Sequence, residues 1–122
     1  MRKVMLGAAI FAAAFANAAL GADMLPLKQG IYVPLQRPCK GASNAEMLSY
    51  WGARSAFSSS QARCTIAKMT RNGNVYTLTD KCADIRGGGE IVGWPTVVTI
   101  ASPTRFALAG TSYRYCGPKA QF

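Results

Sequence analysis

The chain has no histidine among its 122 residues, and that absence excludes several kinds of active site. Hydrolases that pair a serine or cysteine nucleophile with a histidine base are ruled out, as are metal sites with imidazole ligands. Acidic residues are also scarce. The chain has five, Asp23, Glu46, Asp80, Asp84 and Glu90. A carboxylate-dependent glycan hydrolase that pairs Asp80 or Asp84 with Glu90 stays open as one alternative, since glycosidases need only two carboxyl groups.

Closely spaced cysteine pairs are missing too. The chain has four cysteines, and the nearest two, Cys64 and Cys82, stand 18 positions apart. Thioredoxin-like redox sites need a Cys-x-x-Cys pair, and structural zinc sites usually have ligands in close pairs. We therefore expect no metal site and no cofactor. In an exported protein, four such cysteines are typical of two disulfides.

No stretch of the chain is long and apolar enough to cross a membrane as a helix. The N-terminal sequence MRKVMLGAAIFAAAFANAALGA has two basic residues, a short apolar core and the small-x-small site Ala16-Asn17-Ala18. This pattern predicts a secretory signal peptide over residues 1–18, with cleavage as late as residue 22 as an alternative. We expect the mature chain, residues 19–122, to be one domain located in the periplasm or secreted.

The predicted mature chain is basic. It holds 12 lysines and arginines against five acids, a net charge of about +7, and no two basic residues are adjacent. This charge favours an acidic partner, such as an anionic envelope polymer or lipid, or an acidic protein. No zinc-finger spacing, RRM signature or basic helix indicates a specific nucleic-acid site.

Short β-branched and aromatic segments separated by Gly, Pro, Asn or Ser fill the mature chain, and they predict strands. Only Ser43–Glu46, with the spacing of a capping box, suggests one helical turn. The pattern predicts an all-β domain of about seven or eight short strands, as a small antiparallel sandwich or barrel with two disulfides. The expected strands are Gly30–Val33, Met47–Gly52, Cys64–Thr70, Val75–Cys82, Glu90–Trp94, Thr96–Ala101, Arg105–Ala109 and Ser112–Cys116.

The segment CTIAKMTRNGNVYTLTDKC predicts a hairpin, because Asn72-Gly73 is a strong turn signal. A three-residue loop, Asn72–Asn74, would place Cys64 and Cys82 on one apolar face with Ile66, Tyr76 and Leu78. It would place Arg71 on the opposite face. We therefore expect a Cys64–Cys82 disulfide, which leaves Cys39 to pair with Cys116. The rival pairing, Cys39–Cys64 with Cys82–Cys116, stays open.

Aromatic and basic residues recur together, and such a face would stack sugars or bind an anion. The speculative binding residues are Tyr50, Trp51, Arg54, Trp94, Arg105 and Arg114. Strand alternation also predicts that Tyr113 and Tyr115 point one way, into the core, and Arg114 the other way.

Four segments of the sequence carry a resemblance. They are LPLKQGIYV at 25–33, PCKGASNA at 38–45, the Cys64–Cys82 segment and SYRYC at 112–116. Together they resemble a group of small exported proteobacterial proteins with the pattern LPLKxGxYV, PCxxASNA and RYC. The resemblance implies export and a shared cysteine framework. It implies no function, because the group has no assigned activity.

The sequence best fits a non-enzymatic exported binding module for an anionic envelope component or an acidic protein. A second hypothesis is a periplasmic inhibitor of a cell-wall hydrolase, similar in kind to lysozyme inhibitors. It predicts an exposed loop with an aromatic or arginine anchor, within Ser43–Arg54 or Asp84–Trp94. The Ser-Gly-x-x-Tyr signature of lysozyme inhibitors is absent.

Overall fold

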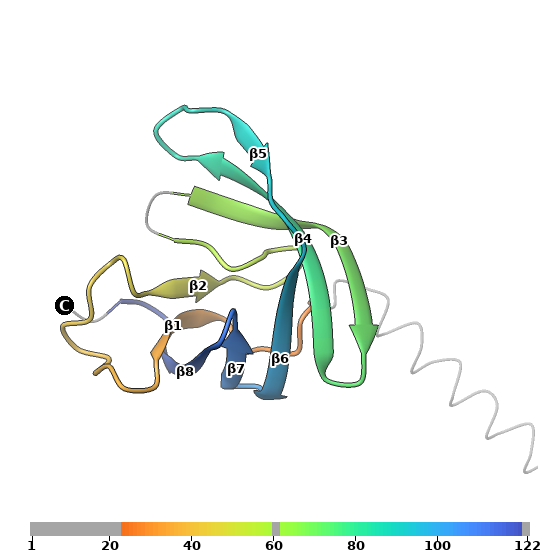
Figure 1. Cartoon of the computed structure of the whole chain (residues 1–122). Coiled ribbons are helices and arrows are strands. Elements are labelled where there is room, and N and C mark those ends of the chain that lie inside the picture. Colours follow the sequence, from red (N-terminus) through yellow and green to blue (C-terminus); the bar gives the residue numbers. More distant parts are fainter. Residues whose placement is uncertain (1–22, 60–61, 121–122) are drawn as a thin grey trace, which may run out of the picture.

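The protein folds as one curled antiparallel sheet in the form of a half-barrel (Figure 1). The structure is a computed structural model that describes residues 23–59 and 62–120. All regular structure in these two ranges is strand, which confirms the all-β prediction. No helix capable of spanning a membrane occurs in them. The predicted signal peptide, 1–18 or 1–22, lies outside the described residues.

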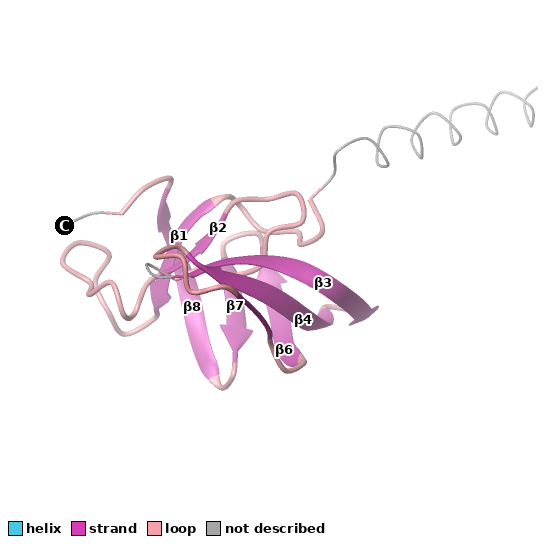
Figure 2. Cartoon of the chain, turned by 90° about the horizontal axis from the view of Figure 1, so that it is seen from above, coloured by secondary structure: helices cyan, strands magenta, loops and turns pink. Residues whose placement is uncertain are grey.

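The described residues form eight strands, and most strands that are consecutive in the sequence are also neighbours in the sheet. Along the sheet they run β2-β1-β8-β7-β6-β4-β3 (Figure 2). The remaining strand, β5, pairs with the end of β4 (Figure 1). Their bounds are β1 Gly30–Pro34, β2 Leu48–Tyr50, β3 Ala62–Asn72, β4 Val75–Asp84, β5 Glu90–Val92, β6 Thr96–Ser102, β7 Arg105–Leu108 and β8 Thr111–Gly117.

An irregular segment, residues 54–58, bridges the two edge strands of the sheet, β2 and β3. On one side, Ser58 and Ser49 exchange backbone hydrogen bonds of 2.9 Å in both directions. On the other side, the Ile66 amide donates to the Arg54 carbonyl at 2.7 Å, and the Ala56 amide to the Cys64 carbonyl at 3.1 Å. The backbone groups of both edges therefore find partners in this segment, which covers otherwise open edges.

The concave side of the sheet holds an aromatic core. Tyr32, Tyr50 and Phe106 are almost completely buried, and the Phe106 ring stacks on Phe57 and Tyr113 with centroid distances of 4.4 and 5.0 Å. Tyr113 and Tyr115 both pack against this core. Arg114 lies on the other side, where it donates to the Cys39 sulfur and the Arg37 carbonyl. The predicted alternation in this strand is confirmed.

Burial of two tyrosine hydroxyls predicts alkaline unfolding. Loss of water around the phenols raises the pKa of Tyr32 and of Tyr50 from 10.0 to about 12. Between those values the folded state keeps protons that the unfolded chain releases, so the free energy of unfolding falls as pH rises from 10 to 12. Urea unfolding at stepped pH across this window checks this. Tyr50→Phe should flatten the fall, and an unchanged slope would contradict the assignment.

Both disulfides have the pairing that the alternation favoured. Cys39 bonds to Cys116 and Cys64 to Cys82, so the rival pairing is wrong. The Cys39–Cys116 bond belongs to a second apolar cluster on the outer side of β1 and β8. Its buried members are Val33, Ala42, Met47 and Cys116. The long loop 35–47 is thereby fixed against the sheet.

The β3–β4 hairpin differs from the prediction in its loop. Asn72 pairs with Val75, so the loop has two residues, Gly73 and Asn74, and not three. Gly73 has a φ of 63°, as the first central residue of a type II′ turn requires. The extra residue that brings Cys64 opposite Cys82 is a β-bulge between Ile66 and Lys68.

The bulge also corrects the predicted position of one side chain. Beyond it, the alternation of β3 is inverted, and Arg71 lies opposite Tyr76. The Arg71 guanidinium lies 5.2 Å from the centroid of the Tyr76 ring. Arg71 is therefore on the same face as Tyr76, whereas the predicted three-residue loop placed it on the opposite face. The predicted apolar set is confirmed, since Cys64, Ile66, Tyr76 and Leu78 are buried and Cys82 packs against them.

The Ser43–Glu46 segment forms a turn and no helix. One of the two interactions of a capping box is nevertheless present, since the Ser43 amide donates to the Glu46 carboxylate at 3.4 Å. The Ser43 hydroxyl donates to the Glu46 carboxylate at 3.0 Å, and the Glu46 amide donates to the Ser43 carbonyl at 3.0 Å. Met47 follows directly and is buried, and β2 begins at Leu48. The chain therefore leaves the turn before a second helical hydrogen bond can form.

Candidate functional site

Two adjoining pockets lie beside Trp51, on the surface where the bridging segment meets β2 and β3. The first has a volume of about 510 Å³ and the second about 190 Å³. They share Ser49, Trp51, Ser58 and Ser59, and we call the two together the Trp51 groove. The first is also lined by Ser55, Ala62, Arg63, Cys64, Thr65 and Ile85, the second by Ile31, Asn44, Met47, Leu48 and Ala120.

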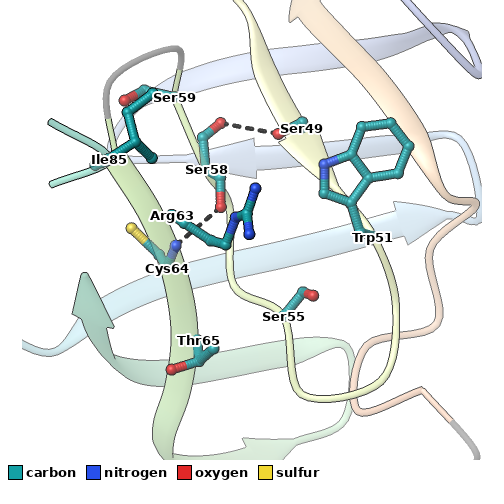
Figure 3. A pocket seen from close by; sticks show the side chains of 10 residues that line it. Ser49, Trp51, Ser55, Ser58, Ser59, Arg63, Cys64, Thr65 and Ile85 are labelled. Carbon is teal, nitrogen blue, oxygen red and sulfur yellow. Dashed lines mark hydrogen bonds between the residues drawn. The ribbon is translucent and has the colours of Figure 1, made fainter. Parts of the chain in front are cut away.

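Serine hydroxyls form much of the groove wall, and two of them hold its shape. Ser58 is buried, and its hydroxyl accepts a hydrogen bond of 3.0 Å from the Cys64 amide. The Ser49 hydroxyl donates to the Ser58 carbonyl at 3.3 Å (Figure 3). These bonds tie β2, the bridging segment and β3 together. Ser55 and Thr65, which form an isolated bridge, add two further hydroxyls.

Trp51 is placed at the groove by a sharp change of chain direction after β2. Gly52 follows it with a φ of 79°, and the Ser55 amide closes the turn by donating to the Gly52 carbonyl at 2.8 Å. The Trp51 side chain is left 49% exposed. A half-exposed indole of this kind offers a flat apolar face with one N–H donor.

Arg63 is the only charged residue among those that line the groove. It projects from the start of β3 toward Trp51 (Figure 3). Within the two described ranges the ion pairs are Arg37–Glu46 and Arg86–Asp84, and Arg63 belongs to neither. Among the described residues, the groove lining thus combines one cation, several hydroxyls and one indole, and it contains no carboxylate. The nearest acid along the chain to this lining, Asp84, lies next to Ile85 and is paired with Arg86.

Comparison with known proteins adds no assignment. The chain matches no protein-family model, no curated protein and no solved structure. The groove is therefore interpreted from its own residues.

The structure separates the six binding residues expected from the sequence. Only Trp51 lines the groove. Tyr50 is fully buried, with its hydroxyl on the Leu25 carbonyl at 3.2 Å, so it belongs to the core and presents no surface to a ligand. Arg54 is exposed, and its guanidinium donates to the Ile66 carbonyl. Trp94 is 88% exposed and follows β5.

Arg105 and Arg114 are brought together in a way that alternation did not predict. They are direct cross-strand partners in β7 and β8. Like charges in this position repel each other. Arg114 is held by the Cys39 sulfur and the Arg37 carbonyl, so its guanidinium anchors the loop before Cys39 to the sheet. We assign this arginine a structural role.

The acidic residues do not assemble into a hydrolase site at the groove. Asp84 forms an ion pair with Arg86 at 3.1 Å, and the hydrogen bonds from Arg86 lower the pKa of the Asp84 carboxyl. A general acid needs the opposite shift. Glu90 is exposed in β5. Asp80 lines a small interior cavity beside Phe57 and Leu78.

One group of potential metal ligands exists in the described residues. The ligand atoms of Cys64, Asp80 and Cys82 lie within 4.8 Å of one another. Both sulfurs are joined in a disulfide, so neither is available as a thiolate. This cluster is therefore a cross-link with an adjacent carboxylate.

Sequence reasoning missed most of the groove. Arg63 looked like one more scattered charge, and residues 55–59 fall between two predicted strands, Met47–Gly52 and Cys64–Thr70. The wall residues Ile31 and Ala120 come from opposite ends of the chain. The sequence did contain one indication of part of the groove. Arg63 and Thr65 flank Cys64, so the predicted Cys64–Cys82 disulfide already placed both residues beside the cross-link of the hairpin.

Proposed function

We propose that the protein is a non-enzymatic, exported binding module that holds an anionic polymer of the cell envelope in the Trp51 groove. The observation that carries this proposal is the composition of the groove: a half-exposed tryptophan beside hydroxyls and Arg63, with no acidic residue in the lining. An envelope location fits the predicted signal peptide, and the two disulfides are compatible with an oxidising compartment.

Each part of the groove matches one part of such a ligand. The indole of Trp51 offers an apolar platform for the face of a sugar ring, and the hydroxyl of Ser55 offers hydrogen bonds to ring hydroxyls. The Thr65 hydroxyl donates to the Lys81 carbonyl at 3.4 Å, so it offers a ligand an acceptor. Arg63 offers the planar fork that binds a carboxylate with two parallel hydrogen bonds. Concave sites with a few converging polar groups are the usual form of small-ligand sites.

The charge of the whole chain supports the same ligand class. The predicted mature chain has 12 basic and five acidic residues, a net charge of about +7, and a basic field raises the encounter rate with polyanions at low ionic strength. Binding of tetragalacturonate, a short carboxylated sugar chain, should therefore weaken as salt rises from about 50 to 200 mM. An affinity that stays constant across this range would overturn the electrostatic part of the proposal.

Replacing Trp51 with alanine should weaken tetragalacturonate binding by about 30-fold, because a central tryptophan typically contributes about 2 kcal/mol or more. Calorimetric titration measures the change. Trp94→Ala is the matched control, since it removes the same side chain from a more exposed position outside the groove, and it should leave the affinity unchanged. Equal losses from both variants would contradict the assignment of the groove.

A second candidate function rests on the flap formed by residues 84–94, which contributes Ile85 to the lining of the groove. This flap carries the Gly-rich turn, β5 and the connection to β6, and it projects from the sheet (Figure 1). Its apolar side chains are unusually exposed, with Ile85 at 60%, Ile91 at 73%, Val92 at 64% and Trp94 at 88%. Exposed apolar patches of this kind mark protein-binding sites.

The flap matches the anchored loop that an inhibitor of a cell-wall hydrolase requires. It also carries Asp84 and Glu90, so it is less basic than the rest of the chain and repels a basic hydrolase less. Inhibition of envelope hydrolases by the purified protein tests this candidate. Trp94→Ala should abolish the inhibition and Trp51→Ala should preserve it, and an absence of inhibition by the wild type would overturn it.

A further inference from the structure

The two halves of the Trp51 groove differ in chemistry. The larger half has the hydroxyls of Ser55 and Thr65 and the guanidinium of Arg63. The smaller half has apolar walls from Ile31, Met47, Leu48 and Ala120, with the amide of Asn44 at its edge. Trp51 belongs to both halves. A sugar ring placed on this indole therefore has one edge toward polar groups and the other toward an apolar recess.

The recess is small and held in place before any ligand binds. Ile31 pairs with Ser49 across β1 and β2, and Met47 is buried in the outer cluster with Cys116. The Cys39–Cys116 disulfide fixes the loop that carries Asn44 and Met47. A preformed wall loses little conformational freedom on binding, which favours selection of a particular shape.

The size of the recess limits what it can hold. Its volume of about 190 Å³ equals the share of about six water molecules in the liquid. An acetamido group, with four non-hydrogen atoms, fits this space together with part of a sugar ring. The apolar walls suit the methyl group, and the side chain of Asn44 offers a polar partner for the amide.

We infer that the ligand of the Trp51 groove contains a 2-acetamido sugar, whose N-acetyl group occupies the recess formed by Ile31, Met47, Leu48 and Ala120. This inference rests on the proposed function and narrows its ligand from anionic polymers in general to those built with N-acetylated amino sugars. Arg63 binds the carboxylate of a neighbouring unit, and Trp51 stacks on the acetamido sugar.

Four oligosaccharides of similar length separate the effect of the acetamido group from the effect of the carboxylate. Cellotetraose has neither group, chitotetraose has acetamido groups only, tetragalacturonate has carboxylates only, and a hyaluronan tetrasaccharide has both. Burial of a methyl group with one amide hydrogen bond should raise affinity about tenfold. We expect hyaluronan to bind most tightly and cellotetraose most weakly. Calorimetric titration of each sugar with the full mature protein gives the four values.

A variant that fills the recess tests its position. Ala120→Phe should remove the tenfold gain from the acetamido group, measured as the ratio of hyaluronan affinity to tetragalacturonate affinity in the same variant. Ala101→Phe is the matched control, because Ala101 is an exposed alanine in β6 that lines neither half of the groove. It should leave all four affinities unchanged.

The outcomes distinguish the inference from the function on which it rests. Equal binding of tetragalacturonate and hyaluronan, with no binding of chitotetraose, would overturn the inference and leave the proposed function standing. Tight binding of chitotetraose that Ala120→Phe removes would support the recess, even if charge proved unimportant. Failure of all four sugars to bind would overturn both.

Discussion

Gly30→Ala is expected to destabilise the protein by about 4 kcal/mol, through combined backbone strain and overpacking. Gly30 begins β1 with a φ of 144°, a conformation that residues with a Cβ rarely adopt. A Cβ at this position would collide with the Gly117 carbonyl oxygen and lie 2.7 Å from the Tyr115 ring. These neighbours are the backbone of β8 and a core side chain whose hydroxyl donates to the Gln29 carbonyl, so neither moves away easily.

Gly41→Ala provides the control for this loss. Gly41 also has a positive φ, 82°, but no atom lies within 4 Å of the position of an added Cβ. Gly41→Ala should therefore lower the free energy of unfolding only by the backbone strain of the positive φ, about 1 kcal/mol. Urea unfolding of both variants, followed by circular dichroism, gives the comparison. Equal losses would show that the contact between β1 and β8 is looser than described.

Removal of the Cys39–Cys116 disulfide is expected to cost more stability than removal of Cys64–Cys82. The two bonds close loops with sequence separations of 77 and 18 residues. In the chain-entropy model these correspond to about 4.5 and about 3 kcal/mol. A domain of this size has a total stability of about 5–15 kcal/mol. Removal of the Cys39–Cys116 bond therefore takes away a large share of the total free energy of unfolding.

Double cysteine-to-alanine variants of each pair make the measurement, again by urea unfolding. The Cys64/Cys82 variant keeps the continuous β3–β4 pairing, so it should remain folded with a lower midpoint. The Cys39/Cys116 variant also loses the anchor of loop 35–47, and it should unfold at lower urea than the first. The reverse order would mean that strain, and not loop length, governs the two bonds.

Much of the fold was predictable because β-structure leaves its period in the sequence. Tyr113, Arg114 and Tyr115 alternate between core and outer side as expected. The parity of Cys64 and Cys82 favoured their pairing but left the rival pairing open, and the structure decides between them. The position of the extra residue in that hairpin was not predictable. A three-residue loop and a bulge satisfy the same parity, and only the backbone pairing places the extra residue beside Ile66.

The groove was much less predictable, because it is built where no period applies. Residues 51–59 form no regular strand, so alternation could not place Ser58 beside Ser49. Tyr50 and Trp51 are adjacent and both aromatic, yet the end of β2 sends the first into the core and leaves the second half exposed. Trp94 looked equivalent to Trp51 in sequence, and it lies on a different surface.

The bulge in β3 has a consequence for how this hairpin can change during evolution. A two-residue loop with no bulge would also place the cysteines opposite each other, if the segment between them were one residue shorter. Loss of Ala67 would therefore preserve the disulfide. Loss of a residue elsewhere in β3 would preserve it only if the bulge also disappeared. A one-residue deletion or insertion in this hairpin therefore keeps the disulfide when it also removes or adds one bulge. In related chains, the number of residues between the two cysteines should then indicate the number of bulges in the hairpin.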